Sequence, residues 1–352
     1  MAFDASYDST PPTGSGVGNR EQLLDLTTVL APRQAPIYGM LPKQAATADL
    51  VEWTVDNLAT PDKDNAVEEG IDIGQTRGGT FDAQFGSLTR LNNRLQHFRG
   101  GFNVSKKQEI FDSVTPVRVQ EAEEKAASQL LRDIESALAS DNSAVAGASG
   151  TAGLFRGLGQ WINSSPTADD VAAVPADFKT PAASILSDSS EDLTESRFNG
   201  MLTSIFEETG EQGDHVLVAG TTVRNAIIDG FTRVHHTTLA DSFATGNSTV
   251  FNQGDGNEIN YNVEIFQGPY GIVKIMSANP KTLPDQKRAY LLDPSLLGYA
   301  EGLSMGSTML EDQGGGPRGY IDHMGTLSSS AFGLKTSLHF LSAVDLMVLV
   351  RS

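Results

Sequence analysis

The sequence predicts an α+β fold organised around one long amphipathic helix. Apolar residues recur at steps of three and four through residues 113–140, the clearest periodicity in the 352-residue chain. Residues 50–56 instead alternate apolar and polar side chains, which is typical of a strand with one buried face. Residues 215–219 form a short apolar run that precedes a helical pattern through Ile228, an order that indicates a separate α/β subdomain.

The long helix is predicted to have one apolar face and one charged face. Its apolar stripe consists of Val119, Ala122, Ala126, Leu130, Ile134 and Leu138. The charged face consists of Glu121, Glu123, Glu124, Lys125, Arg132, Asp133 and Glu135. Thr115 can cap the start, Pro116 suits the first turn, and Asp141 begins the polar run that ends the helix. A helix of about 40 Å with one stripe indicates a backbone for other elements, although an ordinary packing helix has the same pattern.

The composition argues against several classes of protein. The chain has no cysteine, so it has no disulfide framework, thiol nucleophile or cysteine-based metal site. Its first residues lack a basic region followed by an apolar run, so we expect no signal peptide, and no apolar stretch reaches the length of a membrane span. The net charge of -19 argues against tight binding of nucleic acid over a broad surface, but it is compatible with enclosing nucleic acid without adhering to it.

Residues 1–45 predict an extended N-terminal arm. They are rich in Ser, Thr, Gly, Pro and Asp and show no periodicity, although residues 23–30 can form a short helical turn. Beyond that turn, three prolines are expected to keep the chain open: Pro32, Pro36 and Pro42. We expect such a segment to become ordered only against a neighbouring subunit.

Residues 46–107 predict an extended β-hairpin loop that leads into the long helix. Its first strand is 50–56, and its return strand is expected to include Phe98, Phe102 and Val104. The tip is acidic, whereas no acidic residue occurs between Ala83 and Gln108. An isolated two-stranded ribbon is marginal in water, so we expect this one to lie on another subunit. The candidate inter-subunit contact residues are Trp53, Glu68, Glu69, Arg90, Arg94 and Arg99.

The second half of the chain predicts short alternating elements, and none of them carries a recognisable catalytic motif. After a polar loop at 163–190, we expect a helix at 193–208, strands at 215–219, 257–266, 271–276 and 288–292, a flexible loop at 312–319, and apolar strands within 327–350. No nucleophile elbow, zinc-protease motif, phosphate loop or dinucleotide fingerprint occurs in a supporting context. His235 and His236 are adjacent in a polar loop and are too close to share one metal easily. We therefore expect no catalytic, cofactor or metal site.

Two groups of segments carry a resemblance to a known family. NNRLQHFRGGFNVSKKQEIFD, residues 92–112, leads into QLLRDIESAL, residues 129–138, and then FRGLGQWI, residues 155–162. INYNVEIFQGPYGIVKI, residues 259–275, is followed by RAYLLDPS, residues 288–295. With the predicted order of arm, loop, long helix and late strands, the chain resembles major capsid proteins of tailed bacteriophages with the Hong Kong 97-like fold.

The resemblance implies a domain organisation. Residues 1–45 would be the N-terminal arm, 46–107 the extended loop, 108–182 the peripheral domain with its spine helix at 114–140, 183–318 the axial domain with interleaved peripheral strands, and 319–352 the C-terminal strands returning to the peripheral domain. The chain lacks the long N-terminal extension that some relatives use as a built-in scaffold, which implies a separate scaffolding protein or none.

The resemblance also implies a function. The chain would be a virion protein that assembles in the host cytoplasm into an icosahedral head. Its partners would be other copies of itself, in hexamers and pentamers, and scaffolding, decoration and portal proteins, around DNA that it encloses without sequence-specific binding. A net negative charge suits this function, because same-sign repulsion lets packaged DNA slide. Two alternatives remain at this stage, an encapsulin-like shell with a protein cargo and a soluble acidic enzyme.

Overall fold

The computed structural model describes residues 35–56, 63, 69–70, 88–110, 118–162, 185–188, 195–209, 212–228, 265–283, 285–329 and 342–346. The helices are α1 (Pro36–Met40), α2 (Lys106–Ile110), α3 (Arg118–Leu138), α4 (Leu158–Ile162) and α5 (Glu195–Thr209). The strands are β1 (Lys43–Ala45), β2 (Leu50–Asp56), β3 (Leu88–Arg94), β4 (Gln96–Asn103), β5 (Ile185–Asp188), β6 (Gly213–Ala219), β7 (Ile265–Gly268), β8 (Gly271–Ser277), β9 (Arg288–Leu292), β10 (Leu297–Leu310), β11 (Arg318–Ser329) and β12 (Ser342–Leu346). The α+β class that the sequence predicts is confirmed.

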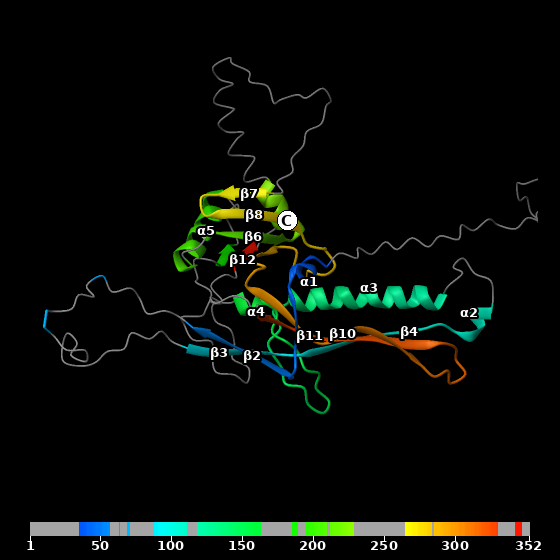
Figure 1. The fold of residues 1–352 in the computed structure, drawn as a ribbon. Helices are drawn as coiled ribbons and strands as arrows, with labels where there is room; N and C mark the ends of the chain where they lie inside the picture. Colours follow the sequence, from blue (N-terminus) through cyan, green and yellow to red (C-terminus); the bar gives the residue numbers. More distant parts are fainter. Residues whose placement is uncertain are drawn as a thin grey trace, which may run out of the picture.

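The long helix α3 lies along a four-stranded sheet with the strand order β1-β10-β11-β4 (Figure 1). β10, β11 and β4 are antiparallel neighbours, and the short β1 runs parallel to β10. Phe98 and Phe102 of β4 and Ile321 of β11 are buried in the same hydrophobic core as the apolar stripe of α3. This packing is why the helix forms in this place, because a sheet with one apolar face needs a cover.

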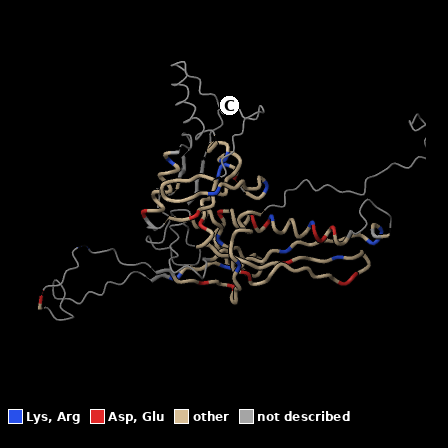
Figure 2. Tube along the Cα trace, turned by 45° about the horizontal axis from the view of Figure 1, so that its top comes forward, with Lys and Arg blue, Asp and Glu red and all other residues tan. Residues whose placement is uncertain are grey.

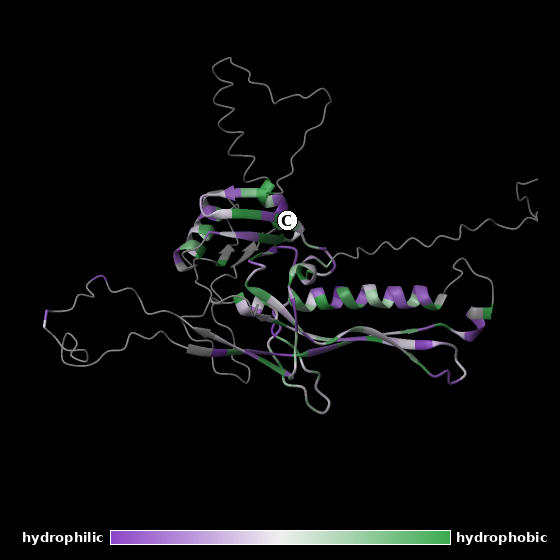
Figure 3. Ribbon diagram, viewed as in Figure 1, coloured by the Kyte–Doolittle hydropathy of each residue, from purple (hydrophilic) through white to green (hydrophobic). Residues whose placement is uncertain are grey.

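The stripe on α3 is confirmed, with burial that increases toward its C-terminal end. Leu130, Ile134 and Leu138 are at most 2% exposed, whereas Val119, Ala122 and Ala126 are partly buried. Figure 3 shows hydrophobic and hydrophilic residues alternating along the helix. The described helix is shorter than predicted, because it runs from Arg118 to Leu138, and its proposed cap at Thr115 and Pro116 lies outside the described residues. The assignment of Glu135 to the charged face is wrong, since its side chain is buried.

A six-stranded sheet lies near the C-terminal end of α3, with the order β5-β12-β9-β6-β8-β7. α5 and the helical residues 221–228 pack on it through a second hydrophobic core. The predicted helix at 193–208 and strands at 215–219, 271–276 and 288–292 are confirmed as α5, β6, β8 and β9. Phe198, Leu202 and Ile205 point into this core as expected, and Phe206 stacks on Tyr270 at the sheet margin.

The ribbon predicted within residues 46–107 differs from the expected one in its return strand. β2 confirms the strand at 50–56, but it pairs with β3, from Leu50 opposite Arg94 to Asp56 opposite Leu88. Phe98 and Phe102 instead belong to β4, which pairs with β11 under α3. The alternation of buried residues in β4 therefore reports its contact with the long helix and not a place in the ribbon.

Two further expectations need correction. Pro36 does not keep the chain open, because it begins α1, which buries Ile37 and Tyr38, and proline suits the first turn of a helix. The polar loop expected at 163–190 contains the strand β5. Within 319–352, expected to return to the peripheral domain, β11 joins the four-stranded sheet and β12 pairs with β5 and β9 of the six-stranded sheet. β10, at 14 residues, was not predicted at all.

Several expectations fall on residues outside the described part of the chain. They are the arm and its apolar run through residue 34, most of the acidic tip including Glu68, the polar residues 163–184, the His235-His236 pair, the strand at 257–264, and residues 347–352.

Candidate subunit interface

The base of the β2–β3 ribbon is anchored in its own subunit. Leu91 is buried, and the ring of Trp53 lies 5.7 Å from that of Trp161 on α4. Asn93 is fully buried, and its amide donates to the carbonyl oxygens of Arg156 (3.2 Å) and Leu327 (3.0 Å). Its own side-chain oxygen accepts the backbone N–H of Arg156 at 2.8 Å. An asparagine with both ends satisfied fixes the ribbon's position, because shifting the ribbon would leave buried polar groups unpaired.

The predicted arginines find acidic partners within the same chain. Arg90 pairs with Glu52 at 3.4 Å across the ribbon, and Arg94 lies 3.7 Å from Asp49. Arg99 of β4 donates to Asp322 of β11 at 3.4 Å and lies over the ring of Tyr320.

These pairs are largely solvent-exposed, so each contributes about 0–1 kcal/mol to stability. Figure 2 shows basic and acidic residues interspersed along the trace of α3 and of the strands beneath it.

The structure brings together only part of the predicted contact set. Trp53 is half-buried against its own subunit, and its contact with a neighbouring subunit stays a prediction. Glu69 is exposed, and Glu68 lies outside the described residues. The side chains of Arg90 and Arg99 remain 67% and 55% exposed despite their ion pairs. Of the six candidates, Glu69, Arg90 and Arg99 therefore stay accessible to another subunit.

Glu135 is a structural residue that the sequence reasoning missed. Its carboxylate accepts the backbone N–H groups of Ile37 and Tyr38, both at 2.9 Å, and so caps α1 from the long helix. Burial raises the pKa of Glu135, although the two hydrogen bonds act in the opposite direction. The only indication of this burial in the sequence is that Glu135 lies next to Ile134, a residue of the apolar stripe. The residues that bury it lie almost a hundred positions earlier in the chain.

A polar cluster continues from α1 into the four-stranded sheet. The ammonium group of Lys43 lies 3.0 Å from the carboxylate of Glu301, and both contact the hydroxyl of Tyr38. The hydroxyl of Tyr299 lies 2.9 Å from Nε2 of the fully buried His323. Burial lowers the pKa of His323 and raises that of Tyr299, so both rings are neutral near pH 7. This cluster orders residues 36–45, the part of the predicted arm that the structure describes.

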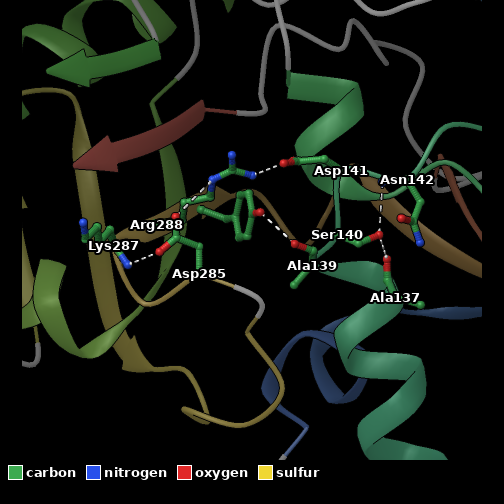
Figure 4. A network of polar contacts seen from close by, with 9 residues as sticks. Ala137, Ala139, Ser140, Asp141, Asn142, Asp285, Lys287 and Arg288 are labelled. Carbon is green, nitrogen blue, oxygen red and sulfur yellow. Dashed lines mark hydrogen bonds and ion pairs between the residues drawn. The ribbon is translucent and has the colours of Figure 1, made fainter. Parts of the chain in front are cut away.

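The two sheets are joined at the C-terminal end of α3 (Figure 4). The hydroxyl of Tyr290 on β9 donates to the carbonyl oxygen of Ala139 at 2.8 Å, and this contact is buried. The guanidinium of Arg288 pairs with Asp141, directly after the helix. The hydroxyl of Ser140 donates to the carbonyl oxygen of Ala137 at 2.7 Å and so satisfies one of the last helix carbonyls. The C-terminal end of α3 thus connects the six-stranded sheet to the helix that packs on the four-stranded sheet.

One hollow collects titratable groups beside the start of β6 in the six-stranded sheet. It has a volume of about 430 Å³ and is lined by Asp214, His215, Lys274 and Asp293, among others. Burial lowers the pKa of His215, against the opposing effect of Asp293 and Asp214. Within the described ranges, no three His, Asp or Glu side chains lie close enough to hold a metal ion. No helix of the described part is long and apolar enough to cross a membrane.

Comparison with solved structures identifies the class of fold. A capsid subunit of cyanophage A-1(L) matches with a TM-score of 0.60 and 16% identity over 96% of this chain and 98% of that one. A Microbacterium phage Oxtober96 structure matches with a TM-score of 0.55 and 12% identity, over 95% and 98% of the two chains. The capsid of a native GTA particle also matches with a TM-score of 0.55, at 11% identity over 98% of this chain and 99% of that one. The fold is therefore the Hong Kong 97-like fold of phage capsids.

The particular family follows from the sequence itself. The model of the SU10 major capsid protein family matches residues 10–328, and the chain belongs to this family. It is a major capsid protein, the structural protein of a phage head. No curated protein sequence matches the chain. Family membership decides against the encapsulin-like alternative, which the fold alone leaves open.

Proposed function

We propose that the chain closes into an icosahedral shell of hexamers and pentamers around double-stranded DNA. The observation that carries this proposal is the family match over residues 10–328, together with a ribbon whose base is fixed by Asn93 while Arg90 stays exposed. A ribbon fixed at its base holds its far end in a defined direction, which suits contact with a neighbouring copy. The shell would assemble in the cytoplasm of a bacterial host and persist in the virion.

The domain organisation supports the same proposal. We propose that α3 with the four-stranded sheet forms the peripheral domain and that the six-stranded sheet with α5 forms the axial domain, because each has its own hydrophobic core. Scaffolding, decoration and portal proteins are the further partners we propose. DNA inside the particles would be held without sequence-specific contacts, since the net charge of -19 disfavours adhesion.

Electron microscopy of the purified protein tests the proposal. We expect closed particles with hexamers and pentamers, formed alone or with a scaffolding protein supplied. A protein that stays a monomer or dimer under both conditions would contradict it. Native particles that contain DNA would further separate a phage head from a shell with protein cargo.

Two variants test whether the ribbon serves assembly more than folding. Replacing residues 58–78 with a short Gly/Ser turn should leave a soluble, folded subunit that no longer closes shells. Reversing Arg90, Arg94 and Arg99 to glutamate should weaken assembly most at low salt, where like-charge repulsion is least screened. Reversing Lys125, which is exposed on α3, is the control for a charge reversal outside the ribbon. Normal particles from both variants would show that the ribbon is only a surface feature.

A further inference from the structure

Among the described residues, the far half of β10 has a neighbouring strand on one side only. The first half is paired on both sides, with β11 and, at Tyr299 to Glu301, with β1. Beyond Glu301, β11 is the sole neighbouring strand within the part of the chain that the structure describes. Pairing with β11 is irregular between Glu301 and Gly306 and regular from Gly306 to Leu310. The regular stretch therefore offers a row of outward-facing backbone N–H and C=O groups.

This edge also lacks the features that normally protect an edge strand. Residues 302–310, with the sequence GLSMGSTML, contain no charged residue and no proline. Leu303, Met309 and Leu310 are 40%, 52% and 44% exposed. Soluble proteins usually place lysine, proline or another charge on such an edge, because an unprotected one pairs with other chains. The opposite edge of the sheet, β4, does carry charge, at Arg99.

We propose that residues 306–310 pair antiparallel with the same residues of a second copy across a two-fold axis. The proposal rests on the proposed self-assembly. A second copy is the expected occupant because the chain belongs to a family of major capsid proteins, which assemble from copies of one chain. Copies with a net charge of -19 repel each other over most of their surface, so an uncharged segment is where they can meet. The uncharged segment brings no like charges together when it pairs with itself, and a two-fold axis makes the same surface available on both copies.

The side chains fit this pairing when it is centred on Thr308. Ser307 then lies opposite Met309, and Gly306 lies opposite Leu310. The exposed Leu310 of one copy meets a residue without a side chain, so there is room for it. Glu311, which follows the segment, falls opposite Met305 and meets no like charge.

A single cysteine at the centre tests the pairing. The chain has no cysteine of its own, so Thr308→Cys introduces the only thiol. Directly opposed residues on antiparallel strands come close enough for a disulfide. We expect mild oxidation of assembled Thr308→Cys particles to convert most of the protein to a covalent dimer. Gln129→Cys, on the exposed face of α3, is the control and should stay monomeric.

Each outcome of this experiment decides the matter. Intact particles in which Thr308→Cys stays monomeric, or in which both variants cross-link equally, overturn the edge pairing and leave the shell function standing. Absence of particles from the wild-type protein overturns the shell function and the pairing with it.

Hydrogen exchange of the wild-type protein is the second, mutation-free measurement. Amides of residues 306–310 should exchange at least ten-fold more slowly in particles of this chain alone than in the free subunit. Protection already complete in the free subunit would mean that another part of the same chain covers the edge. Protection that requires a second protein would mean that this protein is the occupant. Either result overturns the pairing of two copies.

Discussion

The two sheets of the subunit are covered to very different extents. β9, in the six-stranded sheet, is buried on both faces: Ala289 and Leu291 belong to the core with α5, while Tyr290 and Leu292 belong to the core under α3. The four-stranded sheet is covered by α3 on one face, and the far half of β10 is exposed.

The difference indicates which parts of the subunit are complete on their own. A strand that is buried on both faces draws its stability from its own chain, and β9 couples the two hydrophobic cores. A long strand that is exposed beyond its middle has surface left for other molecules. In a major capsid protein, we expect a region like that around β9 to support the subunit and a surface like the far half of β10 to serve assembly.

The largest effect is expected where α3 meets the four-stranded sheet. Ile134→Asp would bury a carboxylate at a position that is 0% exposed, at a cost of roughly 4 kcal/mol or more. That is a large part of the stability of an ordinary domain. We expect the variant to be mainly insoluble on expression, whereas Gln129→Asp on the exposed face should behave as wild type. A soluble Ile134→Asp protein that melts normally would show that this face is not core.

A smaller effect is expected from releasing α1. Glu135→Ala leaves the buried N–H groups of Ile37 and Tyr38 unpaired, so the free energy of unfolding should fall by about 2 kcal/mol. Limited proteolysis should then cleave within residues 35–45, and Glu124→Ala, at an exposed position, should show neither change.

The pH dependence of the Glu135 effect has a defined sign. Burial raises the pKa of Glu135 above its ordinary value of 4.5, so the stability this group contributes is fully present below that pH and is lost as the pH rises. Denaturation curves at several pH values should show the difference between wild type and Glu135→Ala shrinking toward neutral pH. A difference that grows with pH would mean that the two hydrogen bonds outweigh burial.

Substitutions in the contacts between the two sheets should lower the free energy of unfolding less than substitutions in either hydrophobic core. Tyr290→Phe removes one buried hydrogen bond and should lower the free energy of unfolding by about 1 kcal/mol. Arg288→Ala removes an ion pair whose acidic partner is 50% exposed, so its effect should be smaller. Chemical denaturation measures both, with Tyr270→Phe at the sheet margin as the control. An Arg288→Ala effect larger than that of Tyr290→Phe would show that the charged contact dominates the connection between the two sheets.

The smallest effect concerns one buried histidine in each sheet. Burial lowers the pKa of both His215 and His323 below the ordinary value of 6.5. Protonation therefore favours the unfolded chain, and stability should decline as the pH falls below 6.5. His215→Gln and His323→Gln should each reduce the change in melting temperature between pH 7 and pH 5, whereas Gln129→Ala, at an exposed position on α3, should leave it unchanged. Unchanged profiles in both variants would assign the acid sensitivity to other groups.

Local patterns in the sequence were sufficient for several elements and for the family. The stripe on α3 and the strands β2 and β9 follow from the spacing of apolar residues, which reports the buried face of one element at a time. The segments 92–112 and 259–275 carried the resemblance to phage major capsid proteins, and the family match confirms it.

The tertiary structure decided what depends on partners distant in the chain. β10 has no alternating pattern, since its Gly, Ser and Met residues form a strand only when β11 supplies the hydrogen bonds. Phe98 and Phe102 show the alternation of a strand, but which strand they pair with depends on α3 and β11.

Glu135 shows most clearly that sequence periodicity does not reveal contacts with distant parts of the chain. On a helix its charge predicts exposure, yet two N–H groups from α1 make its burial favourable. Periodicity describes the face of a single element, whereas the free energy of burying a polar group depends on which donors the rest of the fold brings to it.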